Sequence, residues 1–593
     1  MLFGSRDLHI WFEMITCKVE TGQVVAFPRT ERLPTRTIFS DTYFKYDENF
    51  WKDFNVIPLE EEISTEVEKK NYLNDASEAQ NVLLGIYLTN VRDAMYGYNM
   101  SIYFSMGTDI SQVEGSTTEN FRILPTNAYP TTQAEVQQTW EALYTGIYRA
   151  NDFLEGISAK INTYSEKDKA LATIYMGEAR ALRAMYYFEL VRRYENIPLM
   201  TSTQMSNQSP STFVQADPAD VYKFIEDDLI YASEVLPYAT DDTEREDNSF
   251  RFSKGAALGL LTKVYATWAS KDASKWEYAA KTAQVLVESG KHDLLPDYEK
   301  LWENTCNSVW DPTESLIEIS FYSPTYSNNS DPVGRIGKWN GVKTTVKMGK
   351  SGSCAGNVKV VHTFVLDWRE SKNAGDLRRD LSVANYRYGD KETIGRFYWA
   401  AKVTDDEATA LDKDQDPEKS QKEKQNYTPA KWDIDKYVKT VSFINNDKSN
   451  VNWYVLRYAD VLLLYAEALN EWKHGPTTEA YDAINKVRRR GFGNPDDTSI
   501  CDLPAGLDEA AFREAVRKER AYELAFEGHR RLDLVRWGIY YKTIQETSNK
   551  LSNWYSSANY VVAQYTEEGK HELMPIPQRE MDLCPQFKQN PKW

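Results

Sequence analysis

The stretch REAVRKERAYELAFEGHRRLDLVRWG, residues Arg513 to Gly538, decides how the rest of the chain is read. Its apolar residues recur at a roughly helical spacing, which predicts one long helix and its exit. Acidic and basic residues three or four positions apart, such as Arg520 and Glu523, can pair along the other face. Because an unpaired buried charge is costly, we interpret this face as a partly buried ion-pair network that fixes helix packing, in preference to a catalytic acid and base set.

The composition excludes several classes of partner. The 593 residues carry a formal net charge of −18, and nucleic-acid binding depends on clustered Lys and Arg, so no nucleic-acid partner is expected. Aromatic residues make up 13% of the chain, more than a core alone requires, so some should be exposed for stacking. No apolar run is long enough to span a bilayer as an ordinary helix, which predicts a soluble or peripheral protein.

Cysteine, histidine and acidic residues give no cofactor or metal site. The five Cys and six His residues are scattered and form neither a CxxC pair nor an HExxH motif. Asp412, Asp414 and Asp416 alternate as in a calcium loop, but Pro417 stands where that loop needs Gly and Lys419 where it needs an apolar residue. We therefore expect a solvated loop at this tract, and no cofactor.

The first residues, MLFGSRDLHIWFEMITC, do not read as a secretory signal. Charged and polar residues interrupt the apolar core that such a signal needs. Cys17 follows Ile15 and Thr16, which is only a faint likeness to a bacterial lipid-attachment sequence. Lipidation at Cys17 is not expected.

Periodic apolar positions predict four pairs of helices. The pairs are Ser77–Val91 with Thr139–Ile157, Glu166–Tyr194 with Pro218–Leu236, Ser253–Trp268 with Ser274–Ser289, and Trp453–Trp472 with Thr477–Arg490. Small residues at the contacts suggest a tetratricopeptide-like repeat, although the strict period of that repeat is missing. The predicted fold class is mostly α, with four tetratricopeptide-like helix pairs, long loop-rich insertions and a few short strands.

The same pattern divides the chain into four regions. Residues 1–74 form an extended N-terminal arm, and residues 75–293 hold the first three helix pairs. Residues 294–452 are an irregular insertion with short apolar runs such as Ser315–Phe321 and Val358–Leu366. Residues 453–593 hold the fourth pair, the charged helix and a tail.

Six ordered motifs carry a resemblance to a known family. They are WEALYTGIYRANDFLEGI (140–157), GEARALRAMYYFELVRRYENIPLM (177–200), RFSKGAALGLLTKVYATWA (251–269), LRYADVLLLYAEALNE (456–471), RKERAYELAFEGHRRLDLVRWG (517–538) and a tail that begins LMPIPQREM (573–581). With these motifs, the chain resembles the SusD/RagB family of surface nutrient-binding proteins from glycan-foraging Gram-negative bacteria.

The resemblance implies a binding protein without enzymatic activity. Such a protein forms a lid over a SusC-like TonB-dependent outer-membrane transporter, binds an oligosaccharide or similar nutrient at the cell surface, and passes it to the transporter. The helical repeats face the transporter, and long loops hold the ligand. Family members have a lipoprotein signal and a Cys shortly before a segment like Asp53–Pro58, and this sequence shows no such Cys there. We expect a different gene start or a different mode of anchoring.

Sugar recognition needs flat apolar faces and a few polar groups, and two loop regions offer both. Family ligands contact loops in these two places, so the resemblance makes their polar and aromatic residues the candidates for ligand binding. They are Tyr98, Asn99, Asp109 and Arg122 in the first region, and Tyr322, Tyr326 and Trp339 in the second. The alternative for each aromatic residue is packing against the helices. Aromatic residues on periodic helix faces are predicted core, namely Trp140, Tyr144, Tyr186, Tyr187, Tyr458 and Tyr465.

Two other functions stay open. One is a tetratricopeptide-like scaffold that binds only proteins or peptides. The other is a glycoside hydrolase with Glu519 and Glu523 as its carboxylate pair, but a hydrolase needs its two carboxyl groups across a ligand cleft. Because these two lie one turn apart among Arg residues, we interpret them as structural.

Overall fold

The computed structural model describes residues 72–114, 120–241, 249–322, 333–344, 353–369, 375–389, 395–398, 422, 424–439, 448–493 and 501–593, and two short strands near the N-terminus. The chain divides into two compact units, Met1–Val67 and Glu68–Trp593. In the first unit, β1 (Val19–Glu20) and β2 (Gln23–Val24) pair antiparallel. The predicted features at Cys17, at Asp412–Asp416 and at Tyr326 lie outside the described residues.

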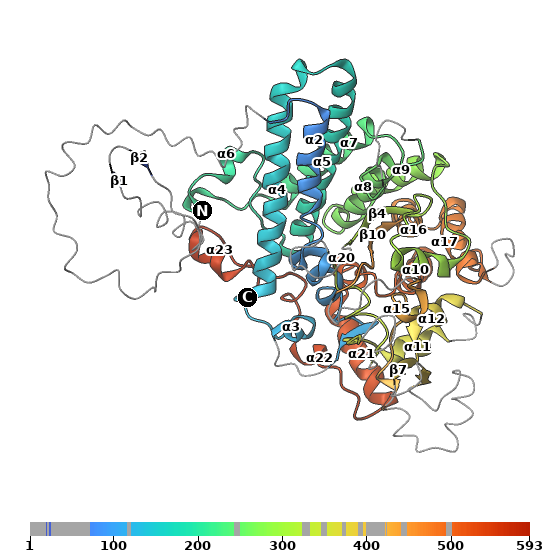
Figure 1. Ribbon diagram of the computed structural model, residues 1–593. Coiled ribbons are helices and arrows are strands. Elements are labelled where there is room, and N and C mark those ends of the chain that lie inside the picture. The colour runs from blue at the N-terminus through green and yellow to red at the C-terminus, as the bar shows by residue number, and fades with distance from the viewer. Residues whose placement is uncertain are drawn as a thin grey trace, which may run out of the picture. The chain divides into compact units, whose positions relative to one another are not determined.

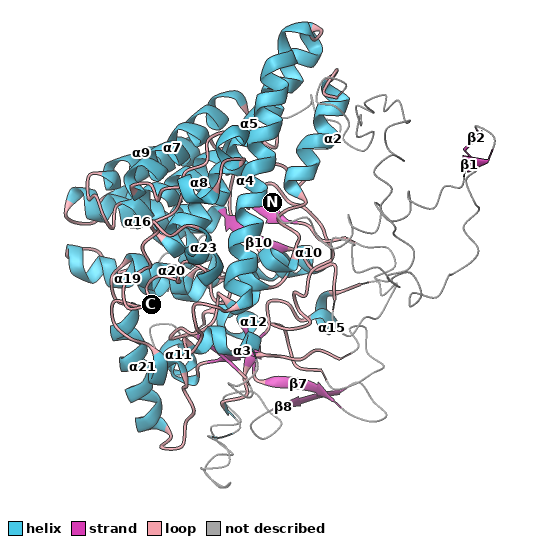
Figure 2. Ribbon diagram, turned by 90° about the vertical axis from the view of Figure 1, so that its left-hand side faces the viewer, coloured by secondary structure: helices cyan, strands magenta, loops and turns pink. Residues whose placement is uncertain are grey.

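The second unit is built on an array of helices in which each packs against the next (Figures 1 and 2). In chain order these are α2 (Ala76–Tyr87), α4 (Ala134–Lys160), α5 (Glu166–Tyr194), α7 (Pro218–Val235), α8 (Lys254–Trp268), α9 (Lys275–Glu288), α16 (Tyr458–Lys473) and α17 (Thr478–Gly491). α2 packs on both α4 and α5. The mostly α-helical fold class is confirmed, and a helix occupies each of the eight predicted places. No helix in the described ranges is both long and apolar enough to cross a membrane.

Local sequence explains where these helices begin. The Asp75, Ser165, Ser253 and Thr477 side chains each accept a hydrogen bond from a backbone N–H in the first turn, as helix N-caps do. Asp217 caps α7 in the same way, and Pro218 follows at the first helical position. These caps set the register in which the apolar faces meet.

Burial confirms most of the predicted aromatic core. Trp140, Tyr186, Tyr187, Tyr458 and Tyr465 are buried. Tyr144 is half-buried against the same core, and its hydroxyl donates to the Pro198 carbonyl at 2.7 Å.

A short antiparallel pair of strands interrupts the helical array. β4 (Ser315–Ile319) pairs with β10 (Trp453–Arg457), with Arg457 opposite Ser315. The predicted helix from Trp453 is therefore wrong in its first turn, because residues 453–457 are taken up by this pairing and α16 begins only at Tyr458. A side chain at Gly259 of α8 would come within 2.9 Å of Leu316 and Leu456, so this glycine lets α8 lie close to both strands.

Shorter elements complete the described part of the second unit. β5 (Val358–Val360) pairs with β3 (Ser111–Val113), and α11 (His362–Trp368) follows, so the apolar run Val358–Leu366 is a strand only in its first part. β6 (Val383–Ala384) pairs with β9 (Thr428–Pro429), and β7 (Tyr386–Gly389) with β8 (Gly395–Tyr398). The remaining elements are η2 (Asp93–Gly97), η3 (Asn99–Tyr103), α3 (Asn120–Ile123), η4 (Leu124–Thr126), η5 (Ile161–Thr163), α6 (Thr203–Ser206), η6 (Pro210–Thr212), α10 (Tyr298–Cys306), α12 (Leu377–Ser382), α15 (Ile434–Tyr437), α19 (Glu509–Glu523), α20 (Arg530–Arg536), α21 (Tyr540–Trp554), α22 (Val562–Tyr565) and α23 (Gln578–Leu583).

The Arg513–Gly538 stretch is not one long helix, as the sequence predicted. α19 ends at Glu523, and α20 begins at Arg530. Phe526 and Gly528 in the connection have φ of 67° and 84°. The break has a tertiary cause, because the Glu523 carbonyl accepts hydrogen bonds from Tyr298 at 3.0 Å, Lys431 at 3.0 Å and Arg457 at 3.3 Å. Donors from three other elements therefore surround the carbonyl at which α19 stops.

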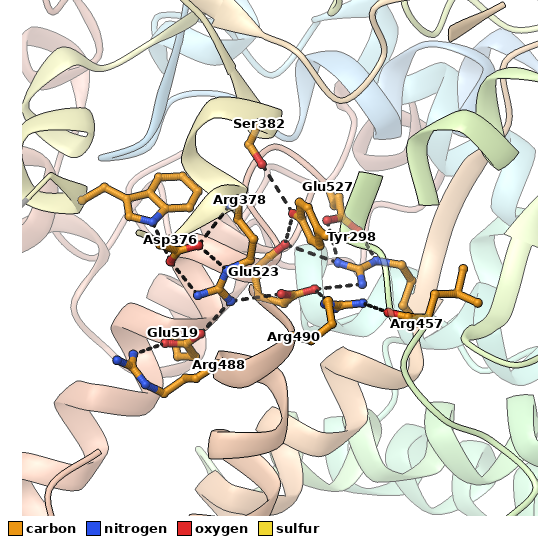
Figure 3. Close-up of polar contacts among 12 residues, drawn as sticks. Tyr298, Asp376, Arg378, Ser382, Arg457, Arg488, Arg490, Glu519, Glu523 and Glu527 are labelled. Atoms are coloured by element: carbon orange, nitrogen blue, oxygen red, sulfur yellow. Dashed lines mark hydrogen bonds and ion pairs between the residues drawn. The ribbon is translucent and has the colours of Figure 1, made fainter. Parts of the chain in front are cut away.

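The predicted ion-pair network is confirmed, and it is buried more deeply than expected (Figure 3). Arg457 contacts Glu314 at 2.6 Å, Glu523 at 3.0 Å and Glu527 at 2.8 Å. The members are five acids and five bases, namely Glu314, Asp376, Glu519, Glu523 and Glu527 with Arg378, Lys431, Arg457, Arg488 and Arg490. Burial acts to raise the pKa of the Glu523 carboxyl, but the nearby arginines outweigh it and lower that pKa to about 2. Balanced charge allows this set to stay buried.

A second group of ion pairs fastens the same stretch to α16. Arg520 pairs with Asp460 of α16 at 2.7 Å and with Asp533 of α20 at 2.9 Å. Arg536 pairs with Glu467 of α16 at 2.6 Å. The two helices and α16 are thus held together by ionised groups.

Candidate functional site

Three aromatic rings from the two predicted loop regions meet at one place. We call Tyr98, Tyr103, Trp339 and the adjacent Arg335 the aromatic platform. The Tyr98 ring centroid lies 4.6 Å from that of Tyr103 and 5.3 Å from that of Trp339, both in edge-to-face geometry. Tyr103 is buried, whereas Tyr98 and Trp339 are half-buried and keep part of their surface open.

Backbone geometry turns Tyr98 toward this place. It lies between the π-helical turns η2 and η3, with φ of −155° and ψ of −61°, outside helical values. The Tyr98 and Tyr103 hydroxyls hydrogen-bond to each other. Burial, with the Tyr98 hydroxyl adding to it, raises the pKa of Tyr103, so that hydroxyl stays protonated at neutral pH.

The second loop holds Trp339 by backbone contacts. The Trp339 carbonyl accepts from the Asn357 N–H at 2.7 Å, just before β5. At Gly341, a side chain would come within 2.5 Å of the Gly337 and Trp432 carbonyl oxygens, so the loop can close on Trp432 only with glycine here. Trp339 is thus carried by a fixed turn.

Arg335 joins the two loops. Its guanidinium carbon lies 4.6 Å from the Tyr98 ring centroid and 5.8 Å from that of Trp339. Its Nη2 pairs with Asp93 at 2.9 Å, and its backbone N–H donates to the Gly97 carbonyl at 3.0 Å. The Arg335 side chain is 18% exposed and that of Asp93 47%, so both reach the surface.

This arrangement suits a sugar better than an ion. Half-open aromatic faces can contact the C–H faces of a pyranose, and a guanidinium and a carboxylate beside them can bind hydroxyl groups. No group of three or more His, Cys, Asp or Glu side chains that could hold a metal ion occurs among the described residues.

The other candidates of the first loop lie apart from this surface or beneath it. Asn99 is buried, and its amide donates to Thr139 at 3.2 Å and to the Glu135 carbonyl at 3.4 Å. Asp109 pairs with Arg530 of α20 at 2.7 Å. Arg122 is half-buried, and its charge acts on Tyr103. Their contact with a ligand stays a prediction.

Tyr322 marks a different surface. Its side chain is 63% exposed, at the rim of an apolar pocket of about 430 Å³ between α2 and β4. Leu88, Phe250 and Leu316 are among the residues that line it.

Sequence analysis missed Arg335 and Asp93, because nothing local shows that residues 242 positions apart form an ion pair.

Glu519 and Glu523 do not face a cleft. Their side chains are almost fully buried, and both contact the same Arg378 nitrogen, at 2.6 Å and 3.1 Å (Figure 3). A guanidinium therefore occupies the space that a glycosidic bond would need between them.

Fold and site together define a mostly helical protein whose loops present a sugar-type binding surface. The family model described as "SusD family" matches residues 321–593, and the model described as "Starch-binding associating with outer membrane" matches residues 63–266. The chain belongs to the SusD family, a family of carbohydrate-binding proteins associated with the outer membrane.

Individual relatives agree with this assignment. A SusD homologue from Bacteroides thetaiotaomicron with a known crystal structure is 72% identical, with a TM-score of 0.86 over 90% of this chain and 100% of that one. SusD-like protein P25 of Formosa agariphila is 24% identical over 89% of this chain and 93% of its own length. A laminarin-binding SusD-like protein, 24% identical over 87% of this chain and 99% of its own, shares the fold with a TM-score of 0.62.

Proposed function

We propose that this protein captures an oligosaccharide or polysaccharide at the cell surface and delivers it to a SusC-like TonB-dependent outer-membrane transporter. The observation that carries the binding step is the aromatic platform, in which Tyr98 and Trp339 present half-open rings beside Arg335. Each half-open ring offers a flat face to one sugar ring of a chain, with polar groups beside it.

Family membership supports the delivery step and the location. One matching family model describes association with the outer membrane. Of two proteins with the same fold, one is named as laminarin-binding and the other as a surface glycan-binding protein. The protein acts by binding and not by catalysis, since the one carboxylate pair suggested by the sequence is enclosed by arginines.

Isothermal titration calorimetry against a panel of purified polysaccharides tests the binding step. The proposal expects saturable binding to at least one polysaccharide, with no reducing sugar released. Binding to no glycan, together with firm capture of a transporter from membranes, would favour the protein-binding scaffold instead. Protease shaving of intact cells tests the location, and a protein that stayed protected would contradict the cell-surface assignment.

A further inference from the structure

A further cavity, with both polar and apolar walls, lies in the helical array, and no residue of the aromatic platform lines it. Its volume is about 320 Å³, and its walls come from the ends of α5, α7 and α8, from α20, and from the tail residues 569–573. Exposed Lys271 and Gly569 stand among the lining residues, so the cavity can be reached from solvent.

His529 presents a hydrogen-bond donor at this cavity. The Lys263 ammonium lies 2.8 Å from His529 Nδ1, and because an ammonium can only donate, Nδ1 accepts and the ring hydrogen is on Nε2. Burial, with the charge of Lys263, lowers the pKa of His529 to about 3, so the ring is neutral. His529 is 7% exposed, and no described residue accepts a hydrogen bond from its Nε2.

Two more polar groups at the cavity lack a partner. Tyr222 is 6% exposed and stacks on Trp268 with 5.2 Å between ring centroids, and no described residue hydrogen-bonds to its hydroxyl. The charges of Arg192 and Glu195, which also line the cavity, act on that hydroxyl. One carboxylate oxygen of Glu572 is buried and has no hydrogen-bond partner among the described groups. The groups at the cavity without a hydrogen-bond partner among the described residues thus include both donors and an acceptor.

The cations that line the cavity are neutralised, whereas the lining acid Glu572 has no ion-pair partner among the described residues. Each lining cation is paired with an acid, in the pairs Arg192–Glu189, Lys263–Asp460, Lys271–Glu195, Arg520–Asp533, Arg536–Glu467 and Lys570–Glu567. Apolar side chains including Val191, Leu464 and Leu532 form other parts of the wall. Because the lining cations are already neutralised, this wall does not favour an anion, and a neutral ligand with apolar and polar faces fits it.

We propose that the cavity at Tyr222, His529 and Glu572 binds one neutral polyhydroxylated molecule of monosaccharide size. A hydroxyl group can accept from His529 Nε2 and donate to Glu572, so a polyol satisfies both kinds of group at once. The volume would otherwise hold roughly ten waters. This site is independent of the aromatic platform and of the polysaccharide that the platform binds.

Saturation-transfer NMR and calorimetry with D-glucose, D-galactose, D-mannose and L-fucose test the proposal. We expect saturable binding of at least one of these sugars by the full chain. Tyr222→Phe removes only the hydroxyl and keeps the stack on Trp268, and Glu572→Leu removes the acceptor. Each should weaken binding about tenfold without a shift of the denaturation midpoint.

Two controls separate this site from other surfaces. Tyr278→Phe changes a tyrosine that is 49% exposed on α9 and should leave monosaccharide binding unchanged. Trp339→Ala should also leave it unchanged, whatever it does to polysaccharide binding. The proposal is overturned if the wild-type chain binds none of the four sugars, if both cavity variants bind as the wild type does, or if crystals soaked in sugar show only water there.

Discussion

Arg457 and Arg335 show how differently one residue type is used in two regions of this molecule. Arg457 is 1% exposed and contacts three glutamates, Glu314 and the neighbouring Glu523 and Glu527 (Figure 3). Arg335 is 18% exposed, pairs with the carboxylate of Asp93, and lies against two half-open aromatic rings. The arrangement around Arg457 leaves no group that could bind a ligand, whereas the arrangement around Arg335 leaves an open aromatic face beside a charge.

The comparison teaches that burial separates charges that hold the fold from charges that face a ligand. A buried charge surrounded by opposite charges is costly to disturb, because removal of one partner leaves the others uncompensated. A half-exposed ion pair contributes little to stability. Side chains in the two regions should therefore respond oppositely to substitution.

The largest expected effect is on stability at the network. Arg457→Met leaves Glu314, Glu523 and Glu527 without their shared partner, and should lower the free energy of unfolding by about 3–5 kcal/mol. Chemical denaturation followed by circular dichroism measures this. Lys281→Met, which breaks an exposed pair with Glu277 on α9, is the matched control and should cost about 0–1 kcal/mol. Equal denaturation midpoints for the two variants would refute the distinction between the buried network and an exposed ion pair.

Lowering the pH should remove part of the stability that the same ion-pair network contributes. The pKa of Glu523 is about 2 in the folded chain, against about 4.3 for an unfolded glutamate. The ionised Glu523 carboxylate therefore contributes roughly 3 kcal/mol to the free energy of unfolding. This contribution is complete above about pH 4.3 and is lost as the pH falls toward 2. Glu523→Gln should be less stable than wild type at pH 7, with a difference that shrinks on acidification. Denaturation midpoints between pH 7 and pH 3 measure this, and a constant difference would contradict it.

At the aromatic platform, a substitution should weaken ligand binding and not stability. Trp339→Ala removes one half-open ring and should weaken polysaccharide binding about 30-fold, near 2 kcal/mol, because buried aromatic anchors carry much of the binding energy at an interface. Calorimetry against the polysaccharide that wild type binds gives the value. Trp472→Ala, at another half-buried tryptophan on α16, is the control and should bind normally. A comparable loss in both variants would point to a general loss of structure.

Much of the fold could be predicted because helical periodicity is a local signal. Tyr186 and Tyr187 were placed in the core by spacing alone, and both are fully buried. The break after Glu523 could not be predicted, since the residues that follow also have helical spacing, and the donors that surround its carbonyl come from Tyr298, Lys431 and Arg457. The sequence also predicts helix at Trp453–Arg457, because the strand with which it pairs lies far away at Ser315–Ile319.

The candidate site was predictable only in part. The family resemblance makes Tyr98 and Trp339 candidates in two ligand-binding loops, but it does not show that they lie next to each other. Asn99 and Asp109 look equally suitable in the sequence, yet they contact Thr139 and Arg530 within the protein. Which polar residues are already engaged depends on tertiary contacts, and single-sequence reasoning has no access to them.

The most direct test is to measure stability and glycan binding together in Arg335→Gln. Our account predicts a midpoint of denaturation within about 1 kcal/mol of wild type, since the pair with Asp93 is half-exposed. It also predicts polysaccharide binding weakened about tenfold, near 1.4 kcal/mol, because the cation beside Tyr98 and Trp339 is lost. Unchanged binding, or a loss of stability as large as that of Arg457→Met, would contradict it.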